Sequence, residues 1–357
     1  MSARVAAILV VLLVILGGAA LLYQRDERSR QPANAGVLGQ PLLKGLKAAD
    51  VAAIRIVQPD GALTLRRTDA GWALAERDGF PADAGKVRDF VIKAISLKIG
   101  QSDAIGEKDR PRLNLDQGAT QVEFQGADGK ALAKLLVGKK YFKQEPDNPQ
   151  KAPGDGRFVM LPDRPGTVYV VADPLTQASA RSADWIDRTA FQVEKVKTLE
   201  VRYADGSGWR VERAADNADW KLAGAKPGEK LEVTKANAAT YSLGLLELAD
   251  VAPKEAKDTG LDSPTLLNAT TLDGLDYAIK VGALQGDNYY VTFQVSGEPQ
   301  KDAGEDKERA ERIKKLEERL PREKRLSGYV LLIPKSKLAD TLKKRDELLA
   351  KPEEAKK

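Results

Sequence analysis

The segment Val51-Ala52-Ala53-Ile54-Arg55-Ile56 decides the fold, because Val196-Lys197-Thr198-Leu199-Glu200-Val201 repeats its pattern 145 residues later. Apolar and polar side chains alternate in both segments, which is typical of a half-buried β-strand. The turn pair Asp60-Gly61 follows the first segment, and Asp205-Gly206 follows the second at the same offset. Asp-Gly between two alternating stretches predicts a tight β-hairpin. The chain is therefore predicted to contain two copies of one module, which indicates its architecture but no activity.

A third strand and a helix follow the hairpin in both copies. The strand carries Trp72 in the first copy and Trp220 at the matching place in the second. Asp83 and Thr234 are the residues expected to cap the two helices, because their side-chain oxygens can accept free backbone N–H groups. The helix positions expected to face the core are Val87, Phe90, Val91, Ala94, Ile95 and Leu97 in the first copy, and Ala238, Tyr241, Leu245, Leu246 and Leu248 in the second.

More alternating strands complete each copy. They begin after Leu115-Asp116 and after Leu261-Asp262, and each set contains a further turn, Asp128-Gly129 or Asp273-Gly274. Hairpin strands interrupted by one helix predict an α+β fold with antiparallel sheets. The fold class expected for the whole chain is an N-terminal transmembrane helix followed by two tandem repeats of antiparallel sheet, with one main helix in each.

The first residues predict a membrane anchor. Residues 5–23 contain no charged side chain, and a helix of that length nearly spans a hydrocarbon core of about 30 Å. A cleaved signal peptide is the alternative, but its apolar core is usually about 7–15 residues long. A lipoprotein is excluded because the chain has no cysteine to acylate. We expect a single-pass protein of the inner membrane, with the bulk of the chain in the periplasm.

These patterns divide the chain into five parts. Residues 1–24 are the expected membrane anchor, and 25–45 form a polar linker. Residues 46–190 are the first repeat module. Residues 191–345 are the second, and they include a charged helical insert at 302–325. Residues 346–357 are expected to form a flexible tail.

The insert at 302–325 is the one place where the copies differ. Its apolar side chains form a thin stripe at helical spacing, at Ala310, Ile313, Leu316 and Leu320. We expect a solvated helix that packs loosely on the sheet, and the alternative is a docking helix for a partner.

Composition excludes several classes of chemistry. The chain has no histidine and no cysteine, which removes Ser-His-Asp and Cys-His catalysis and the usual ligands of zinc. Its 57 basic and 52 acidic residues are interspersed. No basic face is therefore expected, and nucleic acid is not expected as a partner.

The remaining candidates for chemistry are few. Asp184 and Asp187 flank a tryptophan and could serve a glycosidase, although residues of this kind more often pin a turn between domains. Trp72 and Trp220 could stack on a sugar, but matched positions in a repeat favour packing. The loose acidic group of Glu145, Asp147 and Asp155 lacks the spacing of a calcium loop, and residues 126–130 lack that of a phosphate loop. No catalytic, cofactor-binding or metal-binding residue is assigned, and no cofactor is expected.

Several short features together resemble a known family. They are the anchor, the V-x-x-I-x-I hairpin at 51–56, the matched tryptophans, the Leu-Asp blocks, and the V-G strands at 137–138 and 281–282 followed by Tyr169-Val170-Val171 and Tyr329-Val330-Leu331. They resemble the bacterial domain of unknown function 4340 family, as two tandem copies over residues 46–345. Members of that family are often encoded beside ABC transporters of the gliding-motility type.

The resemblance implies a function without catalysis. It implies a membrane-anchored, extracytoplasmic accessory or binding protein whose partner belongs to an ABC-type membrane complex. The alternative is a cell-envelope protein that binds or hydrolyses glycans with carboxylates. Whether Asp184 and Asp187 line a concave pocket or cap a buried turn distinguishes the two.

Overall fold

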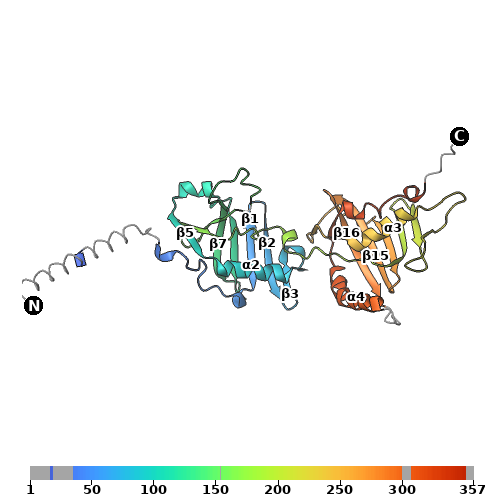
Figure 1. The fold of residues 1–357 in the computed structure, drawn as a ribbon, viewed down its shortest axis with the longest axis horizontal. Coiled ribbons are helices and arrows are strands. Elements are labelled where there is room, and N and C mark those ends of the chain that lie inside the picture. The colour runs from blue at the N-terminus through green and yellow to red at the C-terminus, as the bar shows by residue number, and fades with distance from the viewer. Residues whose placement is uncertain (1–16, 19–34, 153, 300–306, 351–357) are drawn as a thin grey trace, which may run out of the picture. The chain divides into compact units, whose positions relative to one another are not determined.

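A computed structural model describes residues 17–18, 35–152, 154–299 and 307–350 (Figure 1). Their contacts group the described residues into two compact units, one within Met1–Ala62 and Arg88–Ala180, the other within Leu63–Val87 and Arg181–Lys357. The fold is mixed α+β with two antiparallel sheets and few helices, as the strand pattern predicted. No helix among the described residues is both long and apolar enough to cross a membrane. The predicted anchor at 1–24 lies outside them, except for Gly17 and Gly18.

The first sheet has nine strands in the order β4-β3-β2-β1-β6-β7-β8-β9-β5. Their bounds are β1 Ala53–Gln58, β2 Gly61–Thr68, β3 Gly71–Leu74, β4 Phe80–Pro81, β5 Ile99–Ala104, β6 Thr120–Gln125, β7 Ala131–Tyr141, β8 Gly156–Met160 and β9 Thr167–Val171. The second sheet has eight strands in the order β12-β11-β10-β14-β15-β16-β17-β13. Their bounds are β10 Val196–Arg202, β11 Gly208–Glu212, β12 Lys221–Leu222, β13 Asp250–Val251, β14 Thr265–Thr271, β15 Leu275–Gln285, β16 Asn288–Gly297 and β17 Leu331–Pro334.

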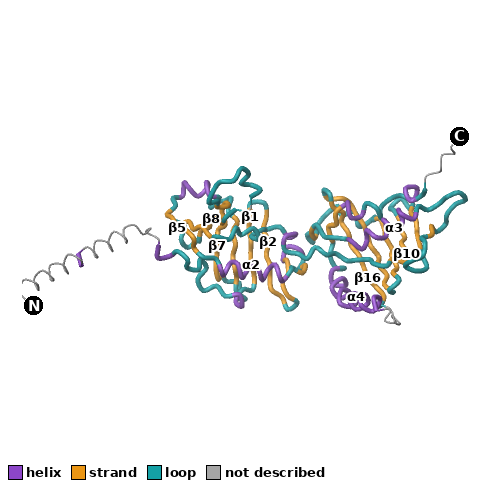
Figure 2. The backbone as a smooth tube through the Cα atoms, in the orientation of Figure 1, coloured by secondary structure: helices purple, strands orange, loops and turns teal. Residues whose placement is uncertain are grey.

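Helices are few in both units (Figure 2). The α-helices are α2 Ala84–Ser96, α3 Val233–Tyr241, α4 Lys307–Leu326 and α5 Lys335–Leu338. Short 3-10 turns used below are η5 Ser182–Asp184, η6 Ser242–Leu245 and η7 Arg345–Leu348.

The two strand orders correspond to each other. Without β4, the first sheet has the order β3-β2-β1-β6-β7-β8-β9-β5, and each of its strands matches the strand at the same place in the order β12-β11-β10-β14-β15-β16-β17-β13. In both sheets the last strand of this order, β5 or β13, is the next strand after the main helix in sequence. The edge strands β5 and β13 were not predicted. β5 reads Ile-Gly-Gln-Ser-Asp-Ala and is mostly exposed, so it shows no alternation of apolar side chains.

Two glycines mark the same crossing in both sheets. A Cβ at Gly138 in β7 would lie 2.3 Å from the backbone oxygen of Leu113, and a Cβ at Gly282 in β15 would lie 2.2 Å from that of Thr259. Both distances are far inside van der Waals contact. Only glycine therefore lets the preceding loop cross the strand so closely.

The cap and the buried face predicted for α2 are confirmed, except that Ile95 is only partly buried. Asp83 Oδ1 accepts the backbone N–H groups of Gly85 at 2.9 Å and Lys86 at 3.2 Å, so Asp83 caps the helix. Phe90 is buried and its ring stacks on Phe124 of β6, with 5.9 Å between the centroids. This contact packs α2 against the sheet, whose strands it crosses in Figure 2.

The prediction for α3 is wrong in its register. The helix begins after Glu232 rather than at Thr234. Its buried face consists of Ala236, Ala239 and Thr240, followed by Leu243 in η6 and by Leu246 and Leu248. Tyr241 and Leu245, which were expected in the core, are 69% and 49% exposed. Two apolar stripes lie side by side on this helix, and the one with the smaller side chains is buried.

The prediction for the charged insert is also wrong in its packing. Within the insert, α4 buries Ile313, Leu316 and Leu320, and it also buries the carboxylate of Glu323. The helix lies beside β16 (Figure 1). It is therefore part of the folded unit rather than a loosely attached, solvated helix.

Both ends of the described chain contribute more structure than expected. In the predicted linker, Leu42 and Leu43 are buried, and Leu42 N–H donates to Leu97 O at 2.8 Å. In the predicted tail, Leu348 is fully buried and Ala350 N–H donates to Lys230 O at 2.8 Å. These segments lack a clear apolar pattern, and backbone hydrogen bonds hold them.

Trp220 and Trp72 differ in burial, which predicts a difference in their contribution to stability. Trp220 is 5% exposed, whereas Trp72 is only partly buried. We expect Trp220→Ala to lower the free energy of unfolding by about 3–5 kcal/mol, the usual range for a buried aromatic side chain. Trp72→Ala should cost less. Urea unfolding of both variants measures the difference, and a loss below about 1 kcal/mol for Trp220→Ala would contradict this packing.

Candidate functional site

The two aspartates predicted as the best acidic pair hold the chain in place. Asp184 forms an ion pair with Arg181, with 2.8 Å between Nη2 and Oδ2. Asp187 Oδ1 accepts the N–H of Thr189 at 2.8 Å, and its other oxygen lies 3.1 Å from Nη2 of Arg322. Asp187 also borders a small hollow of about 260 Å³. Both carboxylates therefore already have partners, and Asp187 caps a turn.

Both the ring face and the N–H group of Trp220 already contact other side chains. Its Nε1–H donates to Asn237 Oδ1 at 2.8 Å, and the guanidinium of Arg213 lies 4.7 Å from its ring centroid. Trp72 carries Arg67 over its ring at 5.4 Å. Cation–π contacts of this kind are worth about 0.5–1 kcal/mol at exposed sites.

The other sequence candidates do not gather into a site. Asp155 accepts the backbone N–H of Lys143, and the turn at 126–130 closes a β-hairpin through Gly126 and Lys130. Glu145 is exposed. Within the described ranges, no group of three or more acidic side chains is placed to hold a metal ion.

A hollow of about 590 Å³ lies beside α3 in the second unit, and it is called the α3 hollow below. It is lined by residues 193–196, 237–238, 240–241 and 244–245, with Arg213, Asp216 and Arg312. The helix contributes one wall and the start of β10 contributes another, while Arg312 reaches it from α4.

Paired charges surround one side of the α3 hollow. The carboxylate of Asp216 is in contact with the ammonium of Lys195 and lies 2.9 Å from Nη2 of Arg213. The hydrogen bond from Lys195 and the attraction of the nearby cations hold the pKa of Asp216 below its usual range. Arg312 binds Asp273 through two nitrogens, at 2.9 and 3.0 Å. Each of these charged groups therefore has a partner of opposite charge.

The opposite wall of the α3 hollow is apolar and open. It carries the side chains of Tyr241 and Leu245, which the helix register leaves outside the core. Exposed apolar side chains rimmed by polar groups are typical of interaction surfaces. The sequence contained a signal for this surface, because the small residues Ala236 and Ala239 mark the face on which a helix approaches a sheet closely.

A buried carboxylate fixes α4 beside this hollow. Glu323 is fully buried, and it accepts hydrogen bonds from the hydroxyl of Tyr277 at 2.8 Å and the N–H of Gln192 at 3.1 Å. Nε of Arg319 lies 2.9 Å from the same carboxylate. Burial raises the pKa of Glu323, and Arg319 opposes this increase. Burial also raises the pKa of the Tyr277 hydroxyl, so this group remains a donor.

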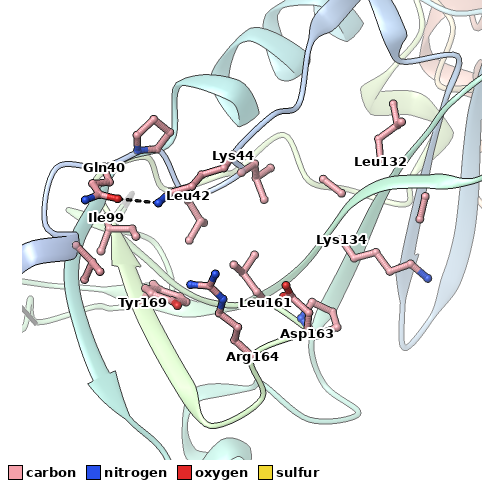
Figure 3. A pocket seen from close by; sticks show the side chains of 16 residues that line it. Gln40, Leu42, Lys44, Ile99, Leu132, Lys134, Leu161, Asp163, Arg164 and Tyr169 are labelled. Atoms are coloured by element: carbon pink, nitrogen blue, oxygen red, sulfur yellow. Dashed lines mark hydrogen bonds between the residues drawn. The ribbon is translucent and has the colours of Figure 1, made fainter.

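A second hollow, of about 460 Å³, lies in the first unit and is called the β7 hollow (Figure 3). It is lined by residues 40–44, 131–134 and 161–164, with Val37, Ile99 and Tyr169. The predicted linker forms one wall, because Ile99 N–H donates to Gln40 O at 3.0 Å and Gly39 N–H donates to Ile99 O at 2.7 Å. Sequence patterns do not indicate this hollow, because the wall at 40–44 carries no strand or helix pattern.

Comparison with known proteins gives one match. The model of a family described as a domain of unknown function (DUF4340) matches residues 72–264, as one continuous stretch. No curated protein and no solved structure matches the chain.

The raised pKa of Glu323 predicts a pH dependence of stability. A carboxyl group whose pKa is raised by folding binds a proton more tightly in the folded state, so its contribution to stability is lost as pH rises through the folded pKa. The free energy of unfolding of the natural chain should therefore fall, relative to that of Glu323→Gln, as pH rises above the usual pKa of a glutamate, about 4.3. Urea unfolding at four pH values measures both curves. Glu318→Gln, on the exposed face of α4, is the control and should run parallel to the natural chain. A curve for Glu323→Gln that runs parallel to the curve of the natural chain would contradict the prediction.

Proposed function

The chain belongs to the DUF4340 family, and on this premise we propose that it is a membrane-anchored extracytoplasmic accessory protein. It acts by binding a protein partner in an ABC-type membrane complex, and it has no catalytic role. In this proposal, residues 1–24 hold the chain in the inner membrane and the two sheets lie in the periplasm.

The observation that carries the proposal is the open apolar wall of the α3 hollow. Tyr241 at the end of α3 is 69% exposed and Leu245 at the end of η6 is 49% exposed, whereas Ala239 and Leu243 in the same two segments are fully buried. Aromatic side chains that keep an apolar body and a polar tip are frequent anchors in protein interfaces. A partner segment can cover both side chains and meet the charged pair of Lys195 and Asp216 at the rim.

Two tandem copies of one module form the second part of the proposal. The corresponding strand orders support it, as do the matching glycine crossings at Gly138 and Gly282. The register of β2 and β3 places Arg67 opposite Trp72. In the second sheet, Glu212 of β11 pairs with Lys221 of β12. Arg213 follows Glu212 and Trp220 precedes Lys221, and the guanidinium of Arg213 lies over the ring of Trp220.

The alternative of a glycan-active protein has less support from the geometry. A glycosidase needs one carboxyl group free to donate a proton and another free to act as a base or nucleophile. Asp184 is paired with Arg181, and Asp187 is held by Thr189 and Arg322. These contacts are those of residues that hold a turn.

We expect the double substitution Tyr241→Ser and Leu245→Ser to weaken partner binding. Both side chains are largely exposed, so the melting temperature should stay within a few degrees of that of the natural chain. Recovery of the ABC-type complex from detergent-solubilised membranes should fall at least tenfold, measured by affinity capture and quantitative mass spectrometry.

The matched control for this experiment is Ile92→Ser. Ile92 is 50% exposed and lies on α2, the helix of the first sheet. This variant should capture the complex as the natural chain does. Equal recovery with the Tyr241/Leu245 variant would remove the α3 hollow as the binding surface, and capture of no ABC-type subunit by the natural chain would reject the proposed function.

Membrane attachment predicts a particular behaviour on fractionation. The natural chain should remain in the membrane pellet after an alkaline carbonate wash, because its apolar segment at 5–23 would span the bilayer. A chain that lacks residues 1–24 should be released. Protease added to spheroplasts should digest the body of the natural chain. A mature protein that begins near residue 21 and is released by osmotic shock would contradict the anchor.

A further inference from the structure

The β7 hollow has the size and the lining of a small-molecule site. Its volume of about 460 Å³ falls within the range of roughly 300–1,000 Å³ that is usual for ligand pockets. Leu42, Ile99 and Tyr169 contribute buried apolar surface, and Leu132 at its border is 42% exposed. An apolar group of a few carbon atoms can therefore leave water by entering the hollow.

The charges around the β7 hollow are not balanced. Lys134 has a partner, Glu123, with 3.3 Å between Nζ and Oε2. Among the residues that the structure describes, Lys44 and Arg164 form no ion pair with a carboxylate. Asp163 forms no ion pair with a cation among the same residues. Two cations against one carboxylate leave a surplus of one positive charge. A monoanion neutralises that surplus.

The orientation of these cations favours a carboxylate. Figure 3 shows the guanidinium of Arg164 turned into the hollow beside Tyr169 and Leu161, whereas the ammonium of Lys134 points away. A guanidinium presents paired N–H donors that match the two oxygens of a carboxylate. Lys44 donates one hydrogen bond to Gln40 Oε1 at 2.7 Å and keeps two further donors.

We propose that the β7 hollow binds a small monocarboxylate with an apolar body, of the chemical class of the medium-chain aliphatic acids. Arg164 binds the carboxylate, and Lys44 adds a second positive charge. Leu42, Leu161 and Tyr169 contact the apolar body. This site is in the first unit, so it does not depend on the partner surface at the α3 hollow.

Hexanoate is the probe that tests the proposal, with hexanol and hexylamine as neutral and cationic probes of equal length. Binding to the full chain in mild detergent is measured by titration calorimetry, with a titration into detergent alone subtracted. We expect the Kd of hexanoate to be at least ten times lower than that of either control. A tenfold ratio corresponds to about 1.4 kcal/mol.

Variants distinguish binding in the hollow from partition of hexanoate into the detergent. Partition is the same for every variant, because all are measured in the same detergent. Arg164→Gln should raise the Kd of hexanoate at least tenfold. Arg88→Gln, at an exposed position on α2, should leave it within twofold. Lys44→Gln is the second variant and should raise the Kd at least threefold, which keeps the test decisive if Arg164→Gln lowers the melting temperature.

Three results would overturn the proposal. The first is equal affinity for hexanoate and hexanol, because the positive charge then plays no part. The second is unchanged hexanoate binding by folded Arg164→Gln and Lys44→Gln. The third is tight binding of the acidic peptide acetyl-Asp-Leu-Asp-amide in the absence of hexanoate binding, which would assign the hollow to a protein segment instead.

Discussion

The burial of Glu323 is the constraint on which the surroundings of the second sheet depend. A carboxylate removed from water must be compensated by hydrogen bonds and an opposite charge, or it costs several kcal/mol. The compensating groups come from three segments, β15 through Tyr277, α4 through Arg319, and the backbone at Gln192. Tyr277 and Gln192 lie outside α4, so their hydrogen bonds to Glu323 hold the helix in place, and from α4 Arg312 reaches Asp273 and the edge of the α3 hollow. Polar contacts therefore orient a helix whose apolar stripe is thin.

The two main helices show how a common arrangement acquires different surfaces. α2 approaches its sheet with Phe90, a large side chain that is buried against Phe124. The buried face of α3 carries the small side chains of Ala236 and Ala239, and the bulky Tyr241 remains outside the core. Exposure of Tyr241 is therefore a consequence of how the core is filled. In the second unit this arrangement leaves the apolar ring of Tyr241 exposed to solvent.

Local patterns predicted much of the fold, and long-range contacts account for what they missed. The hairpins and the Asp83 cap depend on residues close together in sequence, so alternation and capping chemistry were sufficient. The register of α3 depends on which of two apolar stripes meets the sheet, and that choice is made by packing. The candidate surfaces also depend on long-range contacts, since packing leaves Tyr241 outside the core and backbone hydrogen bonds place the segment at 40–44.

The β7 hollow shows why a site of this kind is difficult to recognise from sequence. One wall is a segment without secondary-structure pattern, held by backbone hydrogen bonds between Gly39 and Gln40 and the start of β5 at Ile99. Every residue except proline carries the same backbone donor and acceptor, so such pairing leaves no trace in side-chain periodicity. Its charged residue Arg164 belongs to the turn between β8 and β9, where exposed charge is ordinary. Only the fold shows that the charge of Arg164 lies beside buried apolar side chains. It also shows that Arg164 has no carboxylate partner among the described residues.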